Sequence, residues 1–431
     1  MVRRPTLVGS SIGPNVRPDV VPPAPGGRSR LLRHGSAVAF VAGSSIFSRA
    51  STAIVLVIAA HGLSTADLGL FATLFGVAIA AAYVLASTTG NTLAYWARAQ
   101  PENAIKTAGI FLVISVVGLA LSLPFYLGAG GGEVTAIVIA TVLLLVGGVV
   151  GTVLMQLLRG LGHLKLAVTA GFLVPSVLRL ALSLALISDA SVARMLAASS
   201  AAAAIGGIVG ALLILFPLVA PDRGAGSTYE LSVGLSLAAG MVGVMWFLMG
   251  QLDLTSLTLL HGAEAGGEYA PTMRAFEAMN ALGLAVAFVS IRALAGAAPA
   301  VAIARIKEVI RPSLVLYAVV TAPLLIFGHS ILGFLLGGDV FWSPAAVVAL
   351  AIGYGGNLVM ALCFETFASQ RAKHLLVQVA LATALFALLL TPALVARWGI
   401  AGAAFGNAFS YLFGGAVAYL SLARLARPRE A

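Results

Sequence analysis

Three arginines lie deep inside long apolar stretches of this chain, at Arg49, Arg179 and Arg274. Arg49 belongs to the polar run GSSIFSRAST, and Arg179 follows Pro175, whose missing N–H opens a helix locally. A charged side chain at the centre of a bilayer costs about 2.5–3.5 kcal/mol on insertion scales, so it usually faces a cavity or a partner. The three guanidinium groups therefore predict a cationic lumen for an anionic cargo. The alternative is that each is a structural arginine bonded to carbonyl groups or to a carboxylate.

Acidic and amide side chains accompany Arg274. Arg274, Glu277 and Asn280 recur every three residues and share one face of a helix. Asp253 precedes the joint at 261–268 by about as many residues as Arg274 follows it. The two side chains are therefore expected at a similar depth in the membrane. An Asp253–Arg274–Glu277 cluster would bind a coupling proton or sodium ion, or its members would only neutralise each other. Glu365, about one turn from a membrane surface, is a further gate or lumen candidate together with Asn280.

These residues must be positioned by membrane-spanning helices. The 431 residues are 60% hydrophobic and only 9% charged, whereas soluble domains carry about 25% charged residues. About 20 apolar residues of helix cross a bilayer. We therefore expect an all-α polytopic membrane protein with about twelve transmembrane helices. The expected spans are 36–60, 67–95, 104–128, 133–158, 165–187, 192–219, 231–260, 268–292, 312–336, 342–368, 374–396 and 399–423.

Other compositional features exclude several classes of protein. The single Cys363 lies in an apolar span, which excludes disulfides and cysteine metal clusters. The six histidines show no ligand spacing, so we expect no metal and no cofactor. The net charge of +10 belongs to loops and tails and does not indicate a nucleic-acid partner.

Basic residues outside the spans predict the orientation. Residues 1–35 form an expected disordered basic tail, with no apolar segment before the first span to indicate a cleaved signal peptide. If the N-terminus is inside, one side carries 20 basic residues and the other carries only Arg194 and Arg397. The positive-inside rule then predicts cytoplasmic termini.

Two sequence echoes predict that the halves are repeats. HGLSTADLGLFA, at 61–72, and HGAEAGGEYA, at 261–270, each run from His-Gly through a short joint to Gly, any residue, an aromatic and Ala. GHLKLAV and KHLLVQV form a weaker pair at a similar offset near 200 residues. We expect six-helix lobes at 36–220 and 231–423, related by a pseudo-two-fold axis along the membrane normal. A cytoplasmic loop at 221–230 would join them, and 424–431 would be a second tail.

Four stretches resemble bacterial polysaccharide-repeat flippases, members of the multidrug/oligosaccharidyl-lipid/polysaccharide exporter superfamily. They are FVAGSSIFSRASTAIVLVIAAHGLSTADLGLFATLFG, LMQLLRGLGHLKLAV, QLDLTSLTLLHGAEAGGEYAPTMRAFEAMN and RWGIAGAAFGNAFSY, in the family's order. The resemblance covers all twelve spans; the long Arg- and Pro-rich N-terminal tail departs from the family pattern. It implies a bacterial inner-membrane transporter that flips undecaprenyl-pyrophosphate-linked glycan outward by alternating access, with ion coupling. It also implies cavity arginines at Arg49, Arg179 and Arg274, membrane lipids as surroundings, and a polysaccharide polymerase and glycosyltransferases as partners.

Three other functions remain open at this point. A multidrug exporter of the same superfamily would suit an acidic cavity, whereas the charges of the three arginines and of Asp253, Glu277 and Glu365 nearly balance. An integral membrane polysaccharide polymerase or ligase would need a long outward loop, and no outward joint exceeds about ten residues. A structural scaffold would need no charges inside the membrane. We therefore expect a transporter and no enzyme activity.

Overall fold

The computed structural model describes residues 27–128, 132–216, 233–294, 299–336, 341–370 and 372–425, and within them every regular element is a helix. The expected all-α fold is therefore confirmed for the described part of the chain. The helices are α1 (Gly27–Gly62), α2 (Thr65–Ala99), α3 (Pro101–Tyr126), α4 (Glu133–Gly160), α5 (Leu164–Val168), η1 (Thr169–Leu173), α6 (Val174–Leu184), α7 (Val192–Leu215), α8 (Val233–His261), α9 (Ala263–Leu294), α10 (Pro299–Leu336), α11 (Pro344–Ser369) and α12 (Lys373–Leu425).

The helices are long enough to cross a bilayer. In the described ranges, nine helical segments have both the length and the apolarity of a membrane span. α1 adds a shorter apolar helix, Ile46–Gly62, and the 32-residue α9 is long enough to cross a bilayer but is not among these nine segments. α12 merges the two expected last spans, because Gly399, with φ 53°, turns the chain between two helical halves. Only glycine adopts this left-handed conformation without steric cost. The molecule is thus a multi-pass membrane protein.

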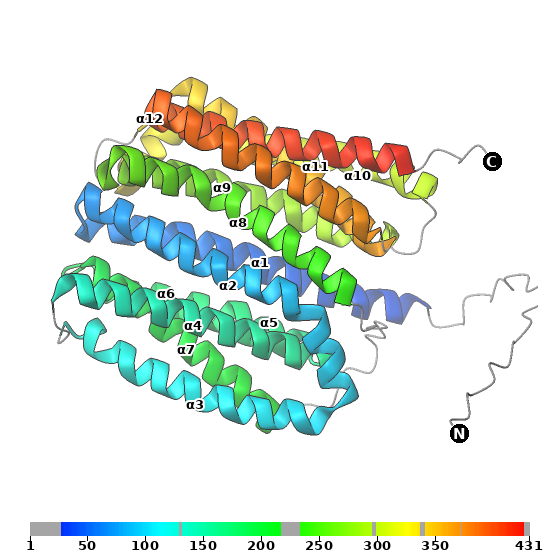
Figure 1. The fold of residues 1–431 in the computed structure, drawn as a ribbon, viewed down its shortest axis with the longest axis horizontal. Helices are drawn as coiled ribbons and strands as arrows, with labels where there is room; N and C mark the ends of the chain where they lie inside the picture. The colour runs from blue at the N-terminus through cyan, green and yellow to red at the C-terminus, as the bar shows by residue number, and fades with distance from the viewer. Residues whose placement is uncertain are drawn as a thin grey trace, which may run out of the picture.

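The helices form two side-by-side groups (Figure 1). α3 to α7 lie on one side and α8 to α12 on the other, with α1 and α2 between them (Figure 1). α2 packs against α4 of the first group and against α8 and α9 of the second, and α1 packs against α9. The expected two-lobe arrangement fits this picture, and α1 and α2 form the N-terminal side of the seam between the lobes.

The fifth span is interrupted where its proline predicts. α5 continues into the π-helical turn η1, and α6 follows with Pro175 in its first turn. Because proline has no N–H to donate, the regular ladder of hydrogen bonds cannot continue through it. The wider π turn rotates the following residues relative to a regular helix. This turn therefore sets the direction in which Arg179 points.

The lobes come into backbone contact where α2 and α9 begin. A Cβ added to Gly69 would overlap the carbonyl oxygen of Ala263, and a Cβ added to Gly267 would overlap the carbonyl oxygen of Thr65. Gly69 and Gly267 are 198 residues apart, as are Thr65 and Ala263. The contact is therefore reciprocal, as at an interface on a two-fold axis. We call these four residues the glycine seam.

One hydrogen bond supports the glycine seam from below. The hydroxyl groups of Thr73 in α2 and Thr258 in α8 lie 2.9 Å apart.

Ser64 caps α2 by accepting from the Asp67 N–H at 3.1 Å and donating to the Asp67 carboxylate at 2.7 Å. An N-cap of this kind satisfies a donor that the first turn leaves free. The cap holds the first turn of α2 in the position that the seam requires.

Several expected boundaries fall partly outside the described residues. α1 begins at Gly27, before the expected first span at 36, so the expected tail at 1–35 is helical in its last part. The rest of that tail, residues 1–26, lies outside the described residues, as do the expected loop at 221–230 and the chain beyond Leu425. The two tails and the inter-lobe loop stay predictions.

The glycine seam predicts a specific cross-link. In a Cys363→Ala background, we expect Thr73→Cys and Thr258→Cys to form a disulfide on mild oxidation, because their side chains are already in contact. Adding Gly267→Val should reduce the cross-linked fraction about tenfold, since overpacking a close contact costs about 1–3 kcal/mol. Gel mobility before and after reduction measures the fraction.

Gly118→Val is the matched control, because a Cβ at Gly118 would meet nothing within 4 Å. The interpretation is wrong if Gly118→Val and Gly267→Val lower the cross-linked fraction equally.

Candidate functional site

The Arg274 side chain links α8 and α9. Its Nη1 donates to Glu277 Oε2 at 2.5 Å, and its Nη2 donates to Gln251 Oε1 at 3.0 Å. Only 6% of the Arg274 side chain is exposed, against 30% for Glu277. The i, i+3 spacing on α9 brings the two charges together, as the sequence predicts. Within the expected cluster, Arg274 and Glu277 therefore form an ion pair, and the Gln251 side-chain amide accepts a further hydrogen bond from Arg274.

A glycine of the opposite lobe makes room for this network. A Cβ on Gly76 of α2 would overlap Gln251 Oε1 and come within 2.6 Å of Arg274 Nη2. Gly76 and Arg274 are 198 residues apart, the same offset as in the glycine seam. The Arg274 guanidinium thus fills the space that the equivalent position of the N-terminal lobe leaves empty.

Asp253 has a separate set of partners. Its Oδ2 accepts from the Tyr269 hydroxyl at 2.7 Å and from Asn407 Nδ2 at 2.8 Å, and its Oδ1 accepts from the Leu254 N–H at 2.8 Å. The side chain is 1% exposed. No direct hydrogen bond joins Asp253 to Arg274 or Glu277 among the described contacts. The expected three-residue cluster therefore divides into an Arg274–Glu277–Gln251 network and an Asp253–Tyr269–Asn407 network.

The sequence reasoning missed Tyr269 and Asn407 as partners. Tyr269 is the aromatic residue of the second sequence echo, and its equivalent in the first is Phe71, which has no hydroxyl. The extra hydroxyl group of Tyr269 was the sequence feature that could have indicated a hydrogen bond to a nearby polar side chain. Asn407 lies in the second half of α12, 154 residues from Asp253 along the chain. No pattern within one helix predicts such a pairing.

Arg49 lies on the seam side of α1. It is exposed and close enough to Glu277 and Tyr411 of the C-terminal lobe to interact electrostatically with both. Arg49 is 13 residues from the end of α1 and Glu277 is 14 residues from the start of α9. At 1.5 Å per residue both lie about 20 Å from that end of the helices. Arg49 therefore faces the opposite lobe at the level of Glu277.

Arg179 is buried within the N-terminal lobe. It is 7% exposed, and its guanidinium carbon lies 5.0 Å above the centre of the Phe75 ring. A guanidinium over an aromatic face is attracted by the negative charge of the ring face. Its Nε is buried without a hydrogen-bond partner, and no carboxylate of the described residues pairs with it. Arg179 is thus a charge whose compensation within the described chain is incomplete.

Glu365 in α11 and Asn280 in α9 have described backbones, but their side chains lie outside the described part of the structure.

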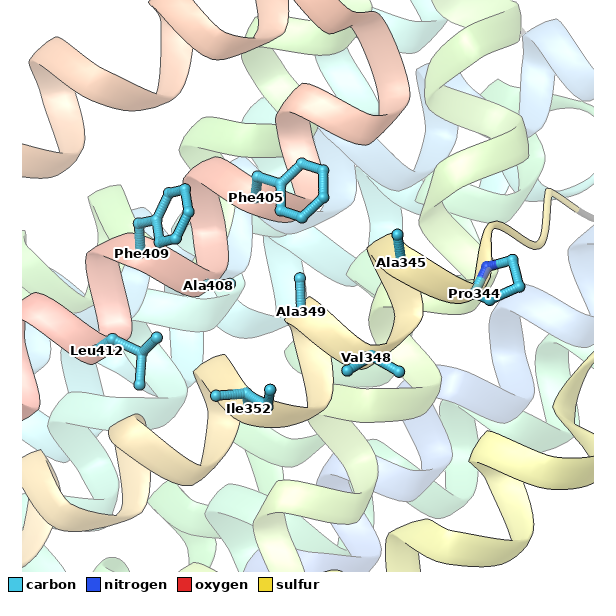
Figure 2. A pocket seen from close by; sticks show the side chains of 9 residues that line it. All are labelled: Pro344, Ala345, Val348, Ala349, Ile352, Phe405, Ala408, Phe409 and Leu412. Atoms are coloured by element: carbon cyan, nitrogen blue, oxygen red, sulfur yellow. The ribbon is translucent and has the colours of Figure 1, made fainter.

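A groove of about 540 Å³ lies between α11 and the second half of α12 (Figure 2). It is lined by Pro344, Ala345, Val348, Ala349, Ile352, Phe405, Ala408, Phe409 and Leu412. With no charged group in its lining, this groove suits hydrocarbon chains and offers nothing to an anion.

Comparisons with known proteins assign the fold. No protein-family model matches the chain, and no curated protein is similar to it in sequence. Among solved structures, an inward-facing multidrug resistance MATE family transporter of the MOP superfamily matches with a TM-score of 0.60 and 16% identity, over 91% of this chain and 100% of that one. The lipid II flippase MurJ in an inward closed conformation matches with a TM-score of 0.63 and 12% identity, over 90% and 89%.

A third match has the same fold. A MOP superfamily transporter from Pyrococcus furiosus, described by the reverse polarity of its binding pocket, has a TM-score of 0.53 and 16% identity, over 91% and 97%. The chain therefore has the fold of MOP superfamily transporters. At these identities the likeness concerns the fold, so the cargo must be argued from the side chains of this chain.

The Asp253 network predicts a stability effect. Asp253→Asn should lower the free energy of unfolding by about 1.5–3 kcal/mol, because it replaces an acceptor of three hydrogen bonds by an amide with only one oxygen. Thermal unfolding of purified protein in detergent measures the change. Glu308→Gln, at an exposed position of α10, is the matched control and should leave the midpoint unchanged. Equal midpoints for all three proteins would show that the network contributes nothing.

Proposed function

We propose that this protein flips undecaprenyl-pyrophosphate-linked oligosaccharide from the cytoplasmic to the periplasmic leaflet of a bacterial inner membrane, for export of a surface polysaccharide. In this proposal both termini are cytoplasmic and the glycine seam closes the periplasmic end of the lumen. One observation carries it: two of the three intramembrane arginines, Arg49 and Arg179, have no ion-pair partner among the described residues. A pyrophosphate headgroup is a strong acceptor for guanidinium groups.

The comparisons support a transporter and leave the cargo open. The likeness to a lipid II flippase supports a lipid-linked glycan. The likeness to multidrug resistance transporters supports a multidrug exporter equally well as far as the fold is concerned. Our preference for an anionic cargo rests on the charges, because a lumen for cationic drugs would be expected to expose carboxylates. Here the Glu277 carboxylate is already paired with Arg274, and the Asp253 carboxylate accepts hydrogen bonds from Tyr269 and Asn407.

The arginines predict loss of export. Arg49→Ala, Arg179→Ala and Arg274→Ala should each abolish surface glycan at normal protein level in cells lacking their own copy. Each lost charge-assisted hydrogen bond is worth about 1.5–3 kcal/mol, which corresponds to roughly a 10- to 100-fold loss in headgroup affinity. Glycan staining and immunoblotting measure the two quantities. Arg397→Ala, at an exposed position, is the matched control and should export normally.

Wild-type export from all three variants would remove the cationic lumen. The multidrug alternative is tested in the same cells: efflux of a cationic dye that depends on this protein and persists in the arginine variants would favour it over the flippase.

Ion coupling is a separate part of the proposal. Asp253 and Glu277 are the candidates for a coupling proton or sodium ion, and Asp253 has the donors of Tyr269 and Asn407 around it. The double variant Asp253→Asn with Glu277→Gln should lose the dependence of flipping on a proton or sodium gradient in proteoliposomes. Full gradient-dependent flipping by the double variant would argue against coupling at these residues.

A further inference from the structure

The Arg274 guanidinium is held from one side and incompletely satisfied on another. Gln251 accepts a hydrogen bond from Nη2, which lies in the space left by Gly76 of α2, and Glu277 accepts from Nη1. The buried Nε has no acceptor among the described residues. An unsatisfied buried donor next to a carboxylate is costly, and an anion with more oxygen atoms would satisfy it.

Glu277 is more exposed than Arg274, its partner in this network. Its side chain is 30% exposed, whereas that of Arg274 is 6% exposed. It is also within electrostatic range of Arg49 of the opposite lobe. A carboxylate and a phosphate group both present anionic oxygen atoms that accept hydrogen bonds from guanidinium groups, so a phosphate group suits the position of the Glu277 carboxylate at Arg274.

We infer that Glu277 is a built-in competitor for the anionic headgroup at Arg274. This inference rests on the proposed function and deepens it, because it assigns the phosphate position to the Arg274–Arg49 pair. When the headgroup enters, a phosphate oxygen replaces Glu277 Oε2 on Nη1, and Nε gains an acceptor. When the headgroup leaves, Glu277 returns and spares Arg274 the cost of an uncompensated buried charge.

The competitor serves release. A transporter must bind its cargo well enough to load it and weakly enough to unload it. Without Glu277, the headgroup would be the only anion available to Arg274, and it would leave slowly. The pair thus predicts a division between affinity and turnover: removal of the carboxylate strengthens binding and slows flipping.

Inorganic pyrophosphate is the probe for the binding half of the test. Its dissociation constant is measured by calorimetry on purified protein in detergent free of anionic lipid. Glu277→Gln should lower this constant about tenfold, within the usual range of coupling between two sites. Flipping of the lipid-linked cargo by the same variant should be slower than wild type. Glu268→Gln, exposed on the same helix, is the matched control and should change neither quantity.

A double-mutant cycle separates competition from a structural role. In an Arg274→Ala background, Glu277→Gln should have no further effect on pyrophosphate binding, because the group for which the two anions compete is gone. Weaker or unchanged binding by Glu277→Gln overturns the inference, as does a gain that persists without Arg274. If Glu277→Gln folds poorly, Glu277→Asp, which keeps the charge on a shorter side chain, is the substitute and should bind pyrophosphate more tightly than wild type.

The outcomes also separate this inference from the proposed function. If wild type binds pyrophosphate and Arg274→Ala does not, the lumen binds anions, and an unchanged constant for Glu277→Gln removes only the competitor. If neither wild type nor Glu277→Gln binds pyrophosphate, both the inference and the anionic cargo fail.

Discussion

Close approach of two helix backbones at the glycine seam is the constraint on which the polar site depends. The carbonyl oxygens of Thr65 and Ala263 occupy the space where Gly69 and Gly267 would otherwise carry a Cβ. Small residues let helices approach to backbone contact, which larger side chains prevent. With the lobes this close, α2 covers Arg274 and Gln251. Water is thereby excluded from one side of the network, where electrostatic interactions are stronger than in solvent.

The frame is nearly symmetric, whereas its chemistry is not. At the 198-residue offset Gly69 matches Gly267, but Phe71 matches Tyr269 and Gly76 matches Arg274. The C-terminal lobe therefore carries both polar networks. The N-terminal lobe supplies space at Gly76 and contributes Arg49 and Arg179, which have no ion-pair partner among the described residues. A repeated fold needs only the glycines and apolar contacts to be kept, so the remaining positions can differ between the lobes.

The candidate site was predictable where one helix determines it. The i, i+3 spacing of Arg274 and Glu277 places them on one face, and the structure pairs them at 2.5 Å. Counting residues from the joint at 261–268 predicted a similar depth for Arg274 and Asp253, and the two are within electrostatic range of each other. What counting could not supply was the direction of each side chain around its helix. Asp253 points to Tyr269 and Asn407 and away from direct contact with Arg274.

The sequence by itself determined the class of fold, because spans of about 20 apolar residues with only short polar joints between them allow little else in a bilayer. Its echo predicted a duplication, and the structure shows that the two echoed segments meet at the glycine seam. Only the tertiary structure decided which intramembrane charges are paired. Arg49 and Arg179 read alike along the chain, yet one is exposed toward Glu277 and the other is buried over Phe75. Helix packing sets that difference through contacts between segments far apart in sequence.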